Sequence, residues 1–196
     1  MGDPQGAPTS RPPELVYVSF AAEINPITTE ALIAVMAEQA RAGVRQVYLL
    51  LATPGGLTMN GLTLYNVLRG MPFELTTHNV GNVDSIGNVV FLAGRKRYAC
   101  PQATFMFHGV GINIRKDDRL EQKALQEGLD HILSDQRRIG SIIAERTRLS
   151  EAEIEDLFRE ARTKDADYAL NHGLIEEIRD VNLLPGAPVI APIFQR

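Results

Sequence analysis

The chain has 196 residues, of which 44% are hydrophobic, and a formal net charge of −4 at pH 7. This length suits one substantial core that buries about 70% of the unfolded surface, and the acidic balance gives no indication of nucleic-acid or anionic-membrane binding. The one cysteine, Cys100, cannot form an internal disulfide, so we expect a reducing, cytoplasmic setting. The sequence contains no run of about 18 apolar residues, so it predicts no membrane span.

The two ends of the chain differ in composition from the middle. Residues 1–13 (MGDPQGAPTSRPP) are rich in proline and glycine and contain no apolar stretch, which predicts a disordered arm rather than a signal peptide. Residues 181–196 are proline-rich but apolar, and we expect them to form an extended strap on the surface of this chain or of a neighbour. Residues 14–180 are expected to form a single domain.

The first half of that domain alternates runs typical of strands with segments of helical spacing. In chain order we predict a strand over 14–20, a helix over 28–43, a strand over 44–52, a helix over 60–70, a strand over 73–80, a buried helix over 85–94 and strands over 97–100 and 103–110. Hydrophobic strands that alternate with helices indicate an α/β fold with a mainly parallel sheet and covering helices.

The second half begins with one long helical pattern. Over residues 117–147 the apolar positions recur at near-heptad spacing, which predicts a helix of about 30 residues and about 45 Å. A helix of that length overshoots a domain of this size, so we expect it to project and to bury its apolar stripe against another subunit. Further on we predict helices over 150–161 and 165–172 and a closing strand over 174–178.

Residues suited to chemistry follow three of the predicted strands. One strand is followed by TPGG (53–56), the next by GNVDSIG (81–87), and His108 lies near the end of a third. The carboxyl ends of parallel strands meet at one edge of a sheet, where functional sites collect. We therefore expect Ser85, His108 and the glycines of the first turn to lie close together.

This set of residues matches what acyl transfer requires. A serine hydroxyl such as that of Ser85 is a weak nucleophile, which His108 could activate as a base. The backbone N–H groups of Gly55, Gly56 and Ile86 could receive the negative charge that develops on a substrate carbonyl oxygen. No group of cysteines and histidines has the spacing of a metal site, so we expect neither a metal nor another cofactor.

The same segments resemble the ClpP family of self-compartmentalising serine peptidases over roughly residues 15–180. The family's Ser-Pro-Gly-Gly turn corresponds to residues 53–56, its nucleophile motif Gly-x-Ala-Ala-Ser-Met-Gly to 81–87, and its Met-Ile-His segment to 106–108. The resemblance implies a ClpP/crotonase-like spiral of mainly parallel strands and covering helices. It also implies that the helix over 117–147 is the protruding handle through which two rings meet.

The resemblance further implies an activity, a substrate class and partners. By this resemblance, the chain would cleave peptides or unfolded chains inside a homo-oligomeric ring or stacked double ring, with Ser85 and His108 as the catalytic pair. Leu57, Gly109 and Val110 would bind the substrate as an extended strand. An AAA+ ATPase is a possible partner, although the N-terminal arm lacks the family's axial-loop sequence.

Two positions depart from the family pattern. Counting back from the Gly-Leu pair at 173–174, the triad aspartate of the family falls on Ala161, which carries no carboxylate. Loss of this acid can cost about 10⁴ in turnover. Asp84 stands beside Ser85 where the family has a small apolar residue, and its carboxylate could orient His108 instead.

Plainer interpretations remain open at this point. Ser85 could only cap the buried helix that follows it, and His108 could be a hydrogen-bonded core residue. Cys100 could pair with His108, but a buried and inert thiol is the simpler interpretation. For the whole chain, the missing acid favours a weak or inactive assembly subunit as the alternative function. A crotonase-like acyl-thioester enzyme is a third possibility, although the sequence shows no signature of a CoA site.

Overall fold

The computed structural model describes residues 13–112 and 121–194 of the chain. Helices and strands alternate along it in this order: β1 Leu15–Ala21, α1 Pro26–Arg41, β2 Gln46–Thr53, α2 Thr58–Gly70, β3 Glu74–Asp84, α3 Gly87–Phe91, β4 Lys96–Ala99, β5 Thr104–Met106, α4 Gln122–Arg146, α5 Glu151–Glu160, β6 Thr163–Asp165, α6 Ala166–Asn171, β7 Glu177–Ile178 and β8 Val189–Ile190. The predicted arm over 1–13 lies almost entirely outside the described residues.

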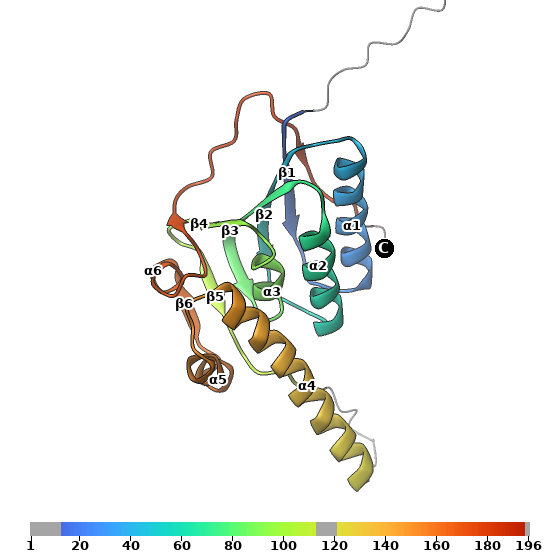
Figure 1. Ribbon diagram of the computed structural model, residues 1–196, viewed down its shortest axis with the longest axis vertical. Coiled ribbons are helices and arrows are strands. Elements are labelled where there is room, and N and C mark those ends of the chain that lie inside the picture. Colours follow the sequence, from blue (N-terminus) through green and yellow to red (C-terminus); the bar gives the residue numbers. More distant parts are fainter. Residues whose placement is uncertain (1–12, 113–120, 195–196) are drawn as a thin grey trace, which may run out of the picture.

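The strands form one mixed sheet that is mainly parallel. Its main path runs β6-β5-β3-β2-β1-β8; β4 pairs with β3 beside this path, and β7 pairs with β4. Every pair of strands is parallel except β5 with β6. The helices α1, α2 and α3 lie together on one face of this sheet (Figure 1). The predicted α/β class with a mainly parallel sheet and covering helices is therefore confirmed.

The strand β3 changes its partner along its length, and this change positions the site. It pairs with β4 over residues 76–79 and with β5 over residues 82–84. The register between β2 and β3 also shifts between Leu51 and Thr53. The strand β3 thus continues through Gly81 to Asp84, four residues beyond the predicted end at 80. Ser85, which follows it, therefore lies beside β5.

Several predicted boundaries differ from those observed. The helix predicted over 85–94 is the five-residue α3, since residues 85 and 86 form a turn before it. The strand predicted over 103–110 is limited to residues 104–106, after which the chain leaves the sheet. The short strands β6 and β8 were not predicted, because neither carries an alternating pattern long enough to recognise.

The long helix α4 extends away from the body of the domain (Figure 1). It has 25 residues, or about 37 Å at 1.5 Å per residue, and neither Gly128 nor Gly140 interrupts it. The predicted start over 117–120 lies outside the described residues. The half of α4 near its carboxyl end buries Ile139 and Ile143 in the domain core. None of the helices in the described ranges combines the length and the hydropathy that crossing a bilayer requires.

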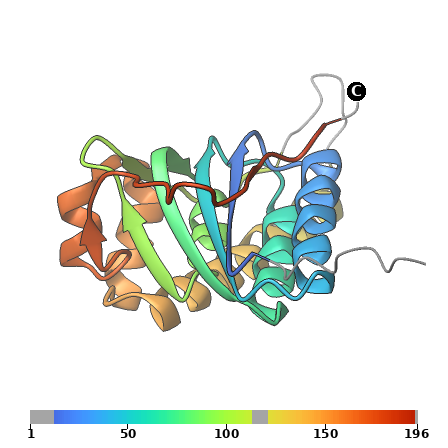
Figure 2. The same cartoon turned by 90° about the horizontal axis from the view of Figure 1, so that it is seen from above.

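The carboxyl-terminal segment lies along its own chain. After β7 it runs across the sheet (Figure 2), and β8 then pairs in parallel with β1. The ring of Phe194 meets that of Phe20 edge-on, with 6.1 Å between centroids. Pairing with β1 covers part of an edge that would otherwise expose unpaired backbone groups.

Candidate active site

The three segments predicted to carry chemistry meet at one end of the sheet. The strands β5, β3 and β2 are neighbours, and their carboxyl ends lead to His108, to Ser85 and to the turn at residues 53–56. A cavity of about 120 Å³ lies where they converge. The predicted site residues that line it are Gly56, Ser85, Ile86, His108, Gly109 and Val110. Gly55 and Leu57 do not line it; Leu57 lies beside it with an exposed side chain.

Ser85 occupies a sharp turn between β3 and α3. Its φ angle is 56°, in the left-handed region that costs an L-residue about 1–2 kcal/mol. Its backbone N–H donates to the carbonyl oxygen of Met106 at 2.7 Å. A residue held at a sparsely populated backbone angle is typical of functional sites, and a sharp strand-to-helix turn exposes a serine hydroxyl in nucleophile elbows.

The turn before α2 lies directly against Ser85 because its glycines have no side chains. A Cβ atom at Gly55 would lie 2.7 Å from both the Asp84 carbonyl oxygen and the Ser85 Cβ. A Cβ atom at Gly56 would overlap the Ile24 carbonyl oxygen. Both glycines also have positive φ angles, 87° and 148°. The Gly-Gly pair is therefore required for this turn to approach both the turn at Ser85 and residue 24.

Within the described residues, the N–H group of Gly55 has a hydrogen-bond partner and that of Gly56 has none. The N–H of Gly55 donates to Thr53 Oγ1 at 3.1 Å. Ile24 bonds to the carbonyl of Gly55 and to the N–H of Leu57, and this parallel bridge turns the N–H of Gly56 to the opposite side. The N–H of Ile86 lies at the start of α3, where helices leave N–H groups without an intrahelical acceptor.

His108 is exposed and is held by its own neighbour. Its Nδ1 lies 2.7 Å from the Gly109 carbonyl oxygen. Since a carbonyl can only accept, this bond places a proton on Nδ1 and leaves the lone pair on Nε2. Within the described residues no hydrogen bond joins the imidazole to the Ser85 hydroxyl. Catalytic hydrogen bonds are often long in unliganded enzymes and tighten when substrate binds.

No carboxylate replaces the missing acid in the described part of the chain. The antiparallel pairing of β5 with β6 ends where Met106 lies opposite Thr163, and Ala161 lies two residues before Thr163. Ala161 has a φ angle of 51° and ends α5. The Asp84 carboxylate accepts from the Asn82 side chain at 2.6 Å and does not line the cavity. Asp165 caps α6 by accepting from Tyr168 N–H at 2.8 Å.

Cys100 does not approach His108. Its Sγ lies 3.6 Å from Nε2 of His78, a fully buried imidazole that the Tyr48 hydroxyl bonds at Nδ1. Burial raises the pKa of the Cys100 thiol and lowers the pKa of His78, so the neutral forms of both groups are favoured. The interpretation of Cys100 as an inert thiol fits this arrangement.

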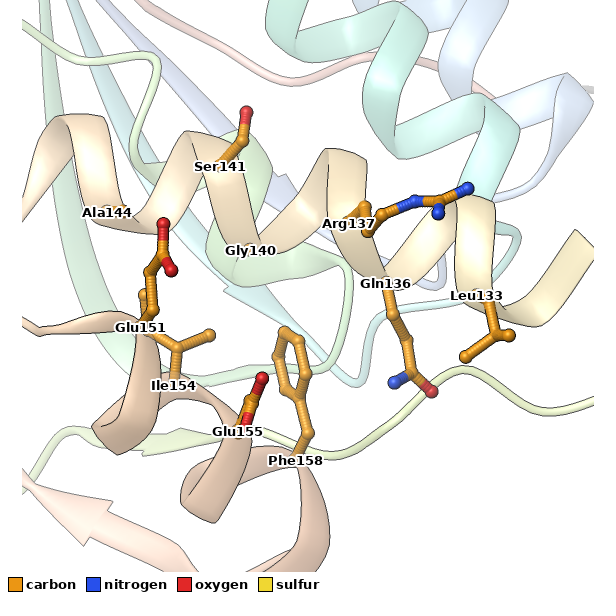
Figure 3. A pocket seen from close by; sticks show the side chains of 10 residues that line it. All are labelled: Leu133, Gln136, Arg137, Gly140, Ser141, Ala144, Glu151, Ile154, Glu155 and Phe158. Atoms are coloured by element: carbon orange, nitrogen blue, oxygen red, sulfur yellow. The ribbon is translucent and has the colours of Figure 1, made fainter.

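A second cavity of about 470 Å³ lies between α4 and α5, and Figure 3 shows its lining. Phe158 points from α5 toward α4 and lines both this cavity and the one at Ser85. Its carbonyl oxygen also accepts from Gly109 N–H at 3.0 Å. The two helices thus contact the strand end that carries His108.

Comparison with known proteins agrees with this geometry. The model of the Clp protease family matches residues 15–182. The chain belongs to the Clp protease family. It is 27% identical to the "ATP-dependent Clp protease proteolytic subunit 1" of Leifsonia xyli subsp. xyli over 149 residues, which cover 71% of this chain and 70% of that protein. The predicted resemblance to ClpP-type proteins is confirmed.

The glycine turn of this Clp family member yields a stability prediction. Gly55→Ala should lower the free energy of unfolding by about 2–4 kcal/mol, since it combines a left-handed alanine with overpacking against Ser85. Gly186→Ala is the matched control, because Gly186 has a similar φ of 81° but open space around it. It should cost only about 1 kcal/mol. Urea unfolding measures both, and equal losses would contradict the close approach of the turn to Ser85.

Proposed function

We propose that this Clp family member is a serine peptidase that cleaves peptides and unfolded chains. The observation that supports the proposal is that Gly56, Ser85 and His108 all line the small cavity. The Ser85 hydroxyl is the nucleophile and His108 is the base. Gly56 N–H and Ile86 N–H form the oxyanion hole, and Gly55 supports the turn instead of donating.

The order of events depends on the hydrogen bond at Nδ1. With Nδ1–H donated to Gly109, Nε2 accepts the proton of Ser85 as Oγ attacks the scissile carbonyl. The oxyanion of the tetrahedral intermediate is stabilised by the two N–H groups. The imidazolium then protonates the leaving amine, and the acyl-enzyme is hydrolysed when a water molecule gives its proton to Nε2. The backbone at Gly109 and Val110, together with the exposed Leu57, holds the substrate as an extended strand.

The expected turnover rate depends on the group that accepts the hydrogen bond from Nδ1 of His108, which is the Gly109 carbonyl. A neutral carbonyl stabilises an imidazolium less than a carboxylate does, because charge-assisted hydrogen bonds are about twice as strong as neutral ones. We therefore propose slow turnover. Ala161 is the observation that favours the second candidate, a catalytically inactive assembly subunit. The family match argues against the acyl-thioester alternative.

Peptide hydrolysis by the full-length protein tests the proposed function. A library of fluorogenic peptides and an unfolded protein such as reduced, alkylated lactalbumin are incubated with it, and products are identified by mass spectrometry. We expect slow cleavage of both and no cleavage of the folded form. An assembled protein that cleaves none of them would contradict the peptidase and favour the assembly subunit.

We also propose that α4 joins copies of this chain, as a handle does. Leu125, Leu129 and Leu133 recur at four-residue spacing on it and are 45–49% exposed. Leu133 also lines the larger cavity, so the apolar stripe continues into the groove between α4 and α5. A second copy that packs its own stripe against this one would remove both from water.

Charge placed in the stripe should break this association. Leu129→Glu is expected to shift the protein to smaller species and to reduce its apparent mass in sedimentation velocity at least two-fold, since it would bury an unpaired carboxylate. Ala124→Glu adds the same charge to an exposed position on the opposite side of α4 and should leave the mass unchanged. Unchanged assembly in Leu129→Glu would rule out the stripe as the contact.

A further inference from the structure

Asn88 is a buried polar residue that the proposed mechanism does not use. It is the second residue of α3 and is only 1% exposed. It does not line the cavity at Ser85. Residues in the middle of a core are normally apolar, so an amide at this position needs a reason.

The side chain of Asn88 bonds to the backbone on both sides of the site. Its Nδ2 donates to the Ser85 carbonyl oxygen at 3.0 Å and to the Met106 carbonyl oxygen at 2.8 Å. Because both partners are acceptors, the amide orientation is fixed by chemistry. Met106 lies two residues before His108, so one amide links the nucleophile turn to the strand that leads to the base.

The amide costs stability that an apolar residue would not. Its Oδ1 is buried and has no hydrogen-bond partner within the described residues, which leaves a desolvation cost uncompensated. Neither carbonyl depends on it, since Asn88 N–H reaches Ser85 at 3.1 Å and Ser85 N–H reaches Met106 at 2.7 Å. Satisfying buried carbonyls therefore does not explain the residue.

We propose that Asn88 is a positioning residue, which clamps the left-handed turn at Ser85 to the end of β5 and so sets the alignment of nucleophile and base. Ser85 is held at a φ of 56°, and such strain persists only where surrounding contacts over-determine the conformation. A second donor on each carbonyl supplies that over-determination. The expected effect on catalysis rests on the proposed function. The structural role of the Asn88 side chain in holding the turn does not depend on that function.

The test compares two truncations in the same short helix. Asn88→Ala removes the clamp, and Val90→Ala removes buried methyl groups from α3 while leaving both carbonyls untouched. Two readouts are taken on the full-length protein. The first is hydrogen exchange, by mass spectrometry, of peptides that contain the Ser85 amide. The second is the rate of phosphonylation by a fluorophosphonate, together with kcat and KM.

Asn88→Ala should exchange the Ser85 amide about ten-fold faster and react with the fluorophosphonate about ten-fold more slowly, with kcat lowered and KM unchanged. Val90→Ala should change neither, even where it lowers Tm more. If Asn88→Ala does not fold, Asn88→Leu keeps the branched shape at Cγ without a donor and serves instead. Exchange and reactivity equal to those of wild type would overturn the proposal, as would equal losses in both variants. A wild-type protein that never reacts, with faster exchange in Asn88→Ala, would contradict the proposed peptidase and still support the clamp.

Discussion

Replacing Ser85 with alanine is expected to lower peptidase turnover by at least roughly 10³-fold, to the background rate. The substitution removes the only atom that the proposed mechanism joins covalently to substrate, and it leaves His108 and the oxyanion donors in place. The fold should be retained, since an alanine fits in the space of a serine. Turnover is measured with the best peptide substrate at saturating concentration, and Tm is measured alongside.

Thr58→Ala is the control for this substitution. Thr58 lines the same cavity and also carries a hydroxyl, but the proposed mechanism gives it no role. We expect it to change turnover less than about three-fold. Activity that survives in Ser85→Ala and disappears in Thr58→Ala would mean that the wrong hydroxyl has been assigned.

Introducing an acid at residue 161 is expected to raise turnover by about 10- to 100-fold. Ala161 lies two residues before Thr163, which pairs with Met106, and Gly109 N–H bonds to the Phe158 carbonyl in the same helix end. We therefore expect a carboxylate at residue 161 to come within reach of Nδ1–H in place of the Gly109 carbonyl. An orienting acid is worth up to about 10⁴ in a complete triad, and only part of that is expected from one introduced side chain. The backbone favours the change, because Asp is enriched in the left-handed conformation that Ala161 adopts.

Ala161→Asn separates charge from shape. Asn tolerates the same backbone angle and has the same size as Asp, but its amide cannot compensate an imidazolium. We expect it to raise turnover less than about three-fold. If Ala161→Asn raised turnover as much as Ala161→Asp, the effect would come from the altered end of α5 and not from the added charge. No gain in Ala161→Asp, with Ser85 still reactive, would contradict the expected reach of residue 161 to His108.

The convergence of the three segments could be predicted from sequence because each segment is recognisable locally. The TPGG turn, the serine between glycines and the Phe-His pair each follow a strand, and parallel strands bring their ends to one edge. Sequence could not show which of the two glycine N–H groups is already engaged. That distinction depends on Thr53, which engages Gly55 N–H, and on the bridge to Ile24, a residue from a different strand connection.

The features that were missed depend on contacts between distant segments. The pairing of β5 with the three-residue β6 joins residues about sixty apart, and three residues carry too little pattern to predict a strand. Asn88 is one polar residue in an otherwise apolar segment of the sequence, and its contacts depend on Met106 lying next to Ser85. Likewise, His78 gave no signal in sequence, although its ring bonds the Tyr48 hydroxyl.

Mass spectrometry of the protein after reaction with a fluorophosphonate tests most directly whether Ser85 is an activated nucleophile. We predict one adduct per chain, located on Ser85 by fragmentation, formed at least roughly 100-fold more slowly in His108→Ala. An adduct on another residue, a rate that does not depend on His108, or no adduct on the folded and assembled protein would contradict it.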